Sequence, residues 1–304
     1  PPEPASDAPR AFAALAANVE ARLSASRTLA DALALFVDAY GPLFGEIQPA
    51  ARATREALAT YLRERGRPES LASLLRGVPS AATDRARRAA AVAATIDPDE
   101  RTAAVAAYVE RFGDEAPVWD VATPTYAEDP GALVRLTTPS APPAHAPPGS
   151  LPSDGAALLQ AARAAAAVAE DDDLLYARLQ ARVRAALLRE GRRLQAANLL
   201  ARPDDVFWLP LELVLRDARG EAPLSLAAVT HAIAQGRAAH DAALADPPPL
   251  SGARAGWDAR AGGVRGRPAS SGRALGPAHL HDPSRPKDLP PNAILIARTL
   301  LPTE

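Results

Sequence analysis

The chain has 304 residues, of which 48% are hydrophobic and 23% are charged, and its formal net charge is −2. This composition fits one large or two ordinary globular domains and excludes a nucleic-acid protein held by bulk positive charge. No apolar run of about 18 residues and no secretory leader is present, so we expect no membrane span and a cytoplasmic location. The absence of cysteine excludes disulfides and thiolate chemistry in this stretch.

Helical patterns dominate the first part of the chain, after a proline-rich tail over residues 1–9 that we expect to be disordered. Thr28 and Asp31 predict a helix start, and Gly41-Pro42 predicts a break before the next helix. Asp97-Pro98 predicts another start, because Asp can cap and proline suits the first helical position. That helix should end at Gly113. Further helices are expected over 46–63, 69–76 and 82–95.

The segment 113–150 has no helical period and is too long for an ordinary connection, so we expect an irregular loop that is partly pinned to the helices. Helical pattern returns at Ser153 and continues, with one expected break, to about Asn198. A turn at 203–205, a short helix to about residue 216 and a last helix over 225–245 follow. After about residue 255, clustered glycines and the apolar run Ile294–Ala297 favour short strands.

Three groups of motifs, in this order, resemble the phosphoenolpyruvate-utilising enzymes, nearest to the rifampicin phosphotransferase and phosphoenolpyruvate-synthase-like branch. The resemblance covers roughly residues 105–304, and no single motif in it is diagnostic. The first group contains Gly113, Trp119-Asp120, Pro124 and Glu128-Asp129-Pro130. The second contains Glu170-Asp171, Tyr176, Gln180, Arg184, Gly191–Leu194 and Asp204–Leu209, and the third contains Gly266–Arg273, Gly276 and Ile294–Ala297.

The resemblance implies a fold and a function. Residues 10–250 would be a helical acceptor-binding domain, and 256–304 the β-rich start of an α/β swivelling domain that carries a phosphohistidine. An ATP-grasp domain or subunit would use ATP and Mg²⁺ to phosphorylate that histidine, and the acceptor would be a small organic hydroxyl compound. The implied carrier motif Gly-Gly-x-x-Ser-His is missing from this chain, as is an ATP-grasp sequence. With no methionine and a Pro1-Pro2 start, we therefore expect a fragment that is inactive alone.

The candidate acceptor-binding residues lie in the irregular loop and on the following helix: Asp114, Glu115, Trp119, Asp120, Gln180 and Arg184. A carboxylate in such a loop can accept the proton of an attacking hydroxyl. Where relatives have His-Arg after the glycine, this chain has Asp114-Glu115, which puts identical acceptor chemistry in doubt. Two alternatives stay open: a non-catalytic helical module that docks separate ATP-grasp and swivelling proteins, and a degenerate relative without chemistry.

Other charged and aromatic groups have structural interpretations that we favour. The stripe Arg178, Arg182, Arg189 and Arg193 could bind an anion but suits a solvated helix face. The acids at 170–173 could bind Mg²⁺ but are more typical of acids that interact favourably with the dipole at the start of a helix.

We expect no metal site, because His231 and His240 lie on opposite helix faces, and we interpret His279 and His281 as surface residues. Trp119, Phe207 and Trp208 could line a pocket but are more typical of core anchors. The glycines at 262–276 could cradle phosphate or form turns.

Overall fold

The protein is described by a computed structural model that covers residues 7–67, 71–137, 150–245, 276–280 and 294–296. Within these residues the chain forms ten α-helices, one π turn, one 3-10 turn and two short strands. The prediction of a mainly α protein is therefore confirmed. The contacts divide the chain into two compact units at the Glu190–Gly191 boundary, and each unit is described by itself.

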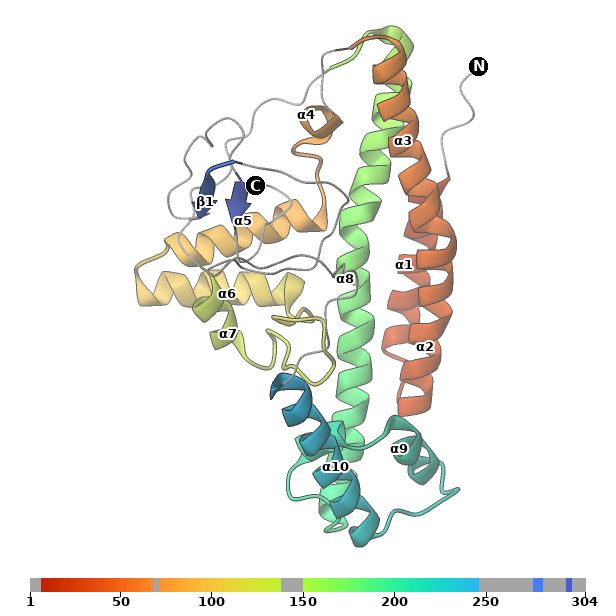
Figure 1. Cartoon of the computed structure of the whole chain (residues 1–304), viewed down its shortest axis with the longest axis vertical. Helices are drawn as coiled ribbons and strands as arrows, with labels where there is room; N and C mark the ends of the chain where they lie inside the picture. The colour runs from red at the N-terminus through yellow and green to blue at the C-terminus, as the bar shows by residue number, and fades with distance from the viewer. Residues whose placement is uncertain (1–6, 68–70, 138–149, 246–275, 281–293, 297–304) are drawn as a thin grey trace. The chain divides into compact units, whose positions relative to one another are not determined.

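In the first unit, α1 (Ala8–Leu23), α2 (Leu29–Pro42) and α3 (Gln48–Glu64) lie along α8 (Ser153–Ala196), as Figure 1 shows. Their shared core is aliphatic: Val19 and Leu35 pack with Leu175 and Leu179 of α8. Alanines allow close helix approach further along α8, where Ala51 and Ala165 are fully buried. Because α1 already begins at Ala8, the expected disordered tail over 1–9 extends too far.

The predicted break at Gly41-Pro42 is wrong. The helical chain continues through Pro42 into a π turn over Leu43–Ile47 and from there into α3. The wider turn accommodates a proline, which cannot donate the usual backbone hydrogen bond. It also buries Leu43 and Ile47 while Phe44 remains exposed. The start of α2 is as predicted, since Thr28 and Asp31 form a reciprocal capping box.

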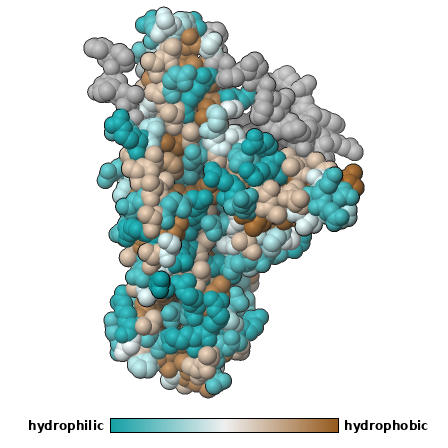
Figure 2. All heavy atoms as spheres, turned by 180° about the vertical axis from the view of Figure 1, so that it is seen from behind, coloured by the Kyte–Doolittle hydropathy of each residue, from teal (hydrophilic) through white to brown (hydrophobic). Residues whose placement is uncertain are grey.

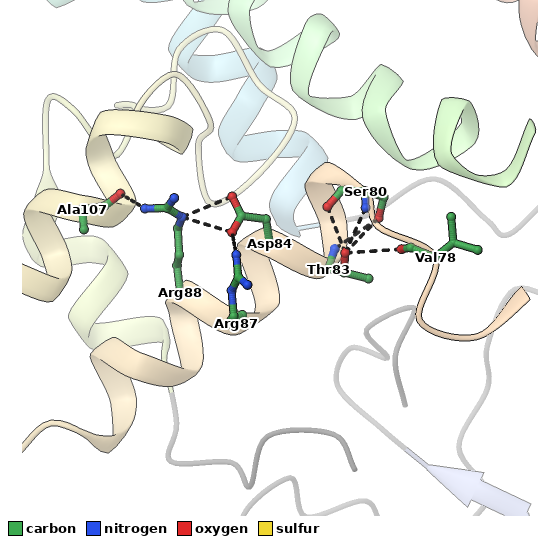
Figure 3. A network of polar contacts seen from close by, with 7 residues as sticks. All are labelled: Val78, Ser80, Thr83, Asp84, Arg87, Arg88 and Ala107. Carbon is green, nitrogen blue, oxygen red and sulfur yellow. Dashed lines mark hydrogen bonds and ion pairs between the residues drawn. The ribbon is translucent and has the colours of Figure 1, made fainter. Parts of the chain in front are cut away.

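A second helical layer of this unit contains α5 (Ala81–Ala94), α6 (Pro98–Phe112) and α7 (Pro130–Leu136), and α4 (Leu71–Leu75) precedes it. The start of α5 is fixed by a capping box in which Ser80 and Thr83 exchange backbone-to-hydroxyl hydrogen bonds (Figure 3). One turn later, Arg88 pairs with Asp84 at 3.2 Å and donates to the Ala107 carbonyl of α6 at 2.7 Å. These contacts join α5 to α6 side by side.

The helix α6 begins as predicted, because Asp97 accepts hydrogen bonds from the amides of Asp99 and Glu100. It ends before Gly113, but not by a left-handed glycine, since the φ of Gly113 is −63°. Here glycine is needed for space: a Cβ would lie 3.2 Å from the Ala127 Cβ and 2.4 Å from the Val109 oxygen.

Two expectations for residues 113–198 are wrong. The loop 113–150 was expected to be irregular throughout, but it contains α7, whose Asp129-Pro130 start repeats the signal of Asp97-Pro98. The expected break after Ser153 is missing, because α8 runs for 44 residues. Its apolar residues contact both helical layers of the first unit, and this packing supports its length better than local propensity could.

The second unit contains the end of α8, a 3-10 turn over Pro203–Trp208, α9 (Leu211–Ala218) and α10 (Leu226–Ala245). Buried Asp205 accepts from the Arg202 amide at 3.0 Å and pairs with Arg237 of α10 at 2.9 Å. Two strands, β1 (Ala278–Leu280) and β2 (Ile294–Ile296), form a parallel pair. Within the described residues this pair is the only β structure, so a β-rich region over 256–304 is not supported.

Within the second unit, the backbone of the 3-10 turn approaches α8 so closely at Gly191 that a side chain would not fit there. A Cβ at this position would lie 2.2 Å from the Pro203 carbonyl oxygen and 2.9 Å from its carbon. We expect Gly191→Ala to lower the free energy of unfolding by about 2 kcal/mol, because the helix and the turn must move apart. Urea denaturation followed by circular dichroism measures the effect. The matched change Gly45→Ala, where a Cβ meets nothing within 4 Å, should cost much less; equal losses would contradict the steric explanation.

On the face drawn in Figure 2, pale brown residues are distributed among teal ones, as expected for helices rich in alanine. No helix among the described residues is long and apolar enough to cross a membrane.

Candidate functional site

The irregular segment between α6 and α7 is held in place by its own backbone. The Tyr126 amide donates to the Glu115 carbonyl at 2.8 Å, and the Ala127 amide donates to the Gly113 carbonyl at 2.9 Å. The two ends of the segment therefore lie against each other, and the residues between them form a closed loop. We call residues 113–129 the acceptor loop, after the role that is expected of it from the sequence.

Arg184 of α8 fastens this loop to the helix. Its guanidinium donates to the Glu128 carboxylate at 2.7 Å and to the carbonyls of Val121 and Ala122 at 3.0 and 2.8 Å. Only 4% of Arg184 is exposed. Burial alone would raise the pKa of Glu128, but the hydrogen bonds from Arg184 and the Thr125 amide outweigh it and hold the pKa below its usual value. Arg184 is thus already occupied by the loop and is not free to bind an acceptor.

Gln180 lies one turn before Arg184 and also contacts the loop. With its amide oriented to satisfy the neighbouring groups, its oxygen accepts from the Val121 amide at 3.1 Å and the Asp120 amide at 3.2 Å. Four of the six candidate residues line one cavity: Asp114, Asp120, Gln180 and Arg184. The cavity measures about 10 Å³, which is room for one water molecule and too small for an organic acceptor.

Glu115, a fifth candidate, points into the core instead of the cavity. Its carboxylate pairs with Arg85 at 3.1 Å and accepts from the Tyr108 hydroxyl at 3.4 Å. Burial raises the pKa of Glu115, although the neighbouring Arg85 charge opposes this shift. The side chain is 8% exposed and ties the acceptor loop to α5 and α6. A role in contacting an acceptor does not fit this position.

Asp114 and Asp120 are the carboxylates that remain accessible. Both have exposed side chains at the cavity. Surrounding protein atoms raise the pKa of Asp114 by removing water from part of the carboxyl group. Asp120 accepts from the Ala122 amide at 2.9 Å, which fixes its direction. Of the candidates, these two could accept a proton from a hydroxyl group at the surface.

Trp119 is not the core anchor that we expected. It is 57% exposed, and its ring meets Tyr176 of α8 edge-on, with 5.2 Å between ring centroids. Tyr176 in turn contacts Phe36 of α2 and Phe44 of the π turn. Tyr176 belongs to the motifs of the resemblance but is not among the candidate site residues, because sequence spacing alone could not place it beside Trp119.

The acids at 170–173 do not precede a helix, so the expected helix-dipole role within their own helix is wrong. They lie in the middle of α8, where Asp171 accepts from the Ala81 amide and thereby caps α5. Gln48 of α3 donates to buried Asp172 at 2.5 Å. Burial, and secondly the charge of Asp173, raise the pKa of Asp172 to about 6.

Three arginines of the predicted stripe have separate protein partners. Arg178 pairs with Glu20, Arg189 donates to the Arg27 carbonyl at 2.8 Å, and Arg193 pairs with Asp217. These contacts fit the helix-face interpretation better than a phosphate cradle.

The histidine and glycine interpretations are tested only in part. His240 lies edge-on to Trp208, with 5.5 Å between ring centroids, and His279 is half-buried in β1. His281 and the glycines at 262–272 lie outside the described residues. Among the described residues, no group of three or more His, Asp or Glu side chains is placed to hold a metal ion.

Comparison with models of known protein families gave no match, and comparison with curated proteins gave none either.

Proposed function

We propose that the helical region binds the hydroxyl acceptor of an ATP-dependent phosphotransferase that resembles the phosphoenolpyruvate-utilising enzymes. The observation that carries the proposal is the pairing of Glu128 with Arg184 at 2.7 Å. Each residue comes from a different motif group of the resemblance, and the two lie 56 residues apart in the chain. The contacts of Gln180 with the acceptor loop and of Trp119 with Tyr176 join the same two groups.

The chemistry assigned to this chain is limited to the acceptor. ATP and Mg²⁺, when bound by an ATP-grasp region, would supply the phosphoryl group through a phosphohistidine. The described residues of this chain would orient the acceptor hydroxyl and take its proton. Asp114 suits the proton-accepting role because burial raises the pKa of its carboxyl group, which makes the carboxylate a stronger base. Asp120, fixed by the Ala122 amide, suits orientation of the hydroxyl.

The test uses the complete reading frame with Asp114→Asn or Asp120→Asn. Each variant should lower acceptor phosphorylation at least tenfold, because a positioned acid-base group contributes about a hundredfold or more. Phosphohistidine formation from ATP should remain unchanged. Phosphohistidine is measured by mass spectrometry, and the product, formed from a panel of hydroxyl compounds, by ³¹P NMR.

Asp99→Asn is the matched control, since Asp99 is an exposed acid of α6 and should leave both steps unchanged. Unaltered acceptor phosphorylation in both site variants would remove the assigned roles. A complete reading frame that forms no phosphohistidine would remove the phosphotransferase proposal itself.

A second candidate is the helical docking module, which one observation favours. The cavity at the acceptor loop has room for about one water molecule, whereas the aromatic side chains beside it are exposed. Such a surface suits recognition of another protein better than enclosure of a small molecule.

A further inference from the structure

Five of the chain's few aromatic residues gather on one surface of the first unit, although they come from three separate segments. Tyr176 of α8 is at the centre, with ring centroids 5.4 Å from Phe36, 6.3 Å from Phe44 and 5.2 Å from Trp119. Tyr40 lies 4.6 Å from Phe44. We call these five residues the aromatic patch.

The aromatic patch is open to solvent. Trp119 is 57% exposed, Tyr40 48% and Phe44 40%, whereas a core aromatic of this unit, Phe112, is fully buried. The rings of Trp119 and Phe44 stand at 69° and 83° to Tyr176, whereas Phe36 and Tyr40 are nearly parallel at 19°. Several ring faces and edges are therefore presented together. Exposed, clustered tryptophan and tyrosine side chains are typical of protein interfaces and their energetic centres.

The sequence around the aromatic patch is acidic. There is no Lys, Arg or His between Arg27 and Arg52, between Arg111 and Arg135, or between Arg163 and Arg178. These three intervals contain all five rings, together with twelve acidic residues.

Some of these acids have protein partners, and some are exposed and close in sequence to the rings. Asp38 is neutralised by Arg22 at 2.8 Å. Glu46 is exposed two residues after Phe44, and Asp120 is exposed directly after Trp119. Glu46 and Asp120 therefore contribute exposed negative charge close in sequence to Phe44 and Trp119.

We propose that the aromatic patch is a docking surface for an arginine-rich segment of a partner protein. A guanidinium group stacks on aromatic faces and is attracted by the ring quadrupole. The exposed carboxylates of Glu46 and Asp120 add charge complementarity at the rim. This inference holds whether or not the chain belongs to a phosphotransferase, because it rests on the rings and charges alone.

The experiment titrates a fluorescein-labelled peptide of alternating arginine and leucine with the chain and follows fluorescence anisotropy. We expect saturable binding that weakens about tenfold in Trp119→Ala and in Glu46→Lys. The peptide with glutamate in place of arginine should not bind, and the lysine peptide should bind several-fold more weakly, since an ammonium group cannot stack as a guanidinium does.

Two matched controls separate the aromatic patch from general attraction. Glu110→Lys changes the net charge as Glu46→Lys does, but on an exposed position of α6. Leu244→Ala removes an apolar side chain that is 70% exposed on α10. Both should bind the peptide as the parent does, and circular dichroism should show the same helicity in all variants.

Three outcomes would overturn the proposal. If Glu46→Lys and Glu110→Lys weaken binding equally, the peptide is attracted by the net charge of the chain and not by the aromatic patch. If the arginine and glutamate peptides bind equally well, the patch does not select a cationic partner. A concentration-dependent dimer in analytical ultracentrifugation that Trp119→Ala abolishes, without peptide binding, would assign the patch to a second copy of the chain.

Discussion

Arg184→Ala should lower the free energy of unfolding by about 3–4 kcal/mol. The substitution removes the charged hydrogen bond to Glu128 and leaves the carbonyls of Val121 and Ala122 without this donor. Losing charge-assisted hydrogen bonds costs about 1.5–3 kcal/mol each, and carbonyls left without a donor add to that loss. Truncation of a nearly buried arginine also removes packing of its aliphatic stem. Urea denaturation monitored by circular dichroism at 222 nm measures the change.

Two further variants show whether the geometry of the guanidinium matters. Arg184→Lys keeps the charge but not the planar fork, so it should recover less than half of the loss. Arg135→Ala breaks the exposed pair with Asp129 and should cost less than about 1 kcal/mol. If Arg184→Ala costs no more than Arg135→Ala, Arg184 does not fasten the acceptor loop.

Asp172→Asn should stabilise the protein at neutral pH, by about 2–3 kcal/mol at pH 7.5. Burial raises the pKa of Asp172 to about 6 from an ordinary value of 3.8, so the folded state holds this proton more tightly than the unfolded state. The stability that the carboxyl group contributes is complete below about pH 4 and is lost as the pH rises through about 6. Asparagine has no charge to bury, and its oxygen still accepts from Gln48.

The pH dependence distinguishes this explanation from a simple packing effect. The difference between Asp172→Asn and the parent should approach zero near pH 4 and reach its full value above pH 7, as measured by urea denaturation across that range. Asp154→Asn changes an exposed acid of the same helix that pairs with Arg65 at 2.9 Å, and it should alter stability by less than about 1 kcal/mol. A gain for Asp172→Asn that does not vary with pH would refute the titration account.

Helix starts could be predicted from the sequence wherever the signal is local. Thr28 with Asp31 and Asp97 with Pro98 both begin helices as expected, because capping involves side chains and amides only two or three residues apart. The same local signal at Asp129-Pro130 begins α7, within a segment that has no helical period in its sequence. Helix breaks are harder to predict from the sequence, because tertiary packing can override local propensity. This is the case where α2 continues through Pro42.

In the candidate site, too, local features could be predicted from the sequence, whereas contacts between distant segments could not. The sequence predicts Asp114, Asp120, Gln180 and Arg184 as candidate site residues, and these four line one cavity. It could not reveal that Arg184 is occupied by the loop, because Glu128 lies 56 residues away. Nor could the spacing show that Glu115 points inward or that Trp119 meets Tyr176, since both depend on how α8 packs.

The π turn between α2 and α3 sets the rotational phase of the helices that it joins. One residue advances an ordinary helix by about 100°, and the wider turn lets α3 begin at an angle that an uninterrupted helix would miss. Leu35 and Ala39 before the turn, and Ala51 and Leu58 after it, all reach the interior. Shortening the turn to ordinary helical winding would bring polar positions of α3 to face α8. The turn thus acts as a fixed angular spacer, and Phe44 is the large apolar residue that it leaves facing outward.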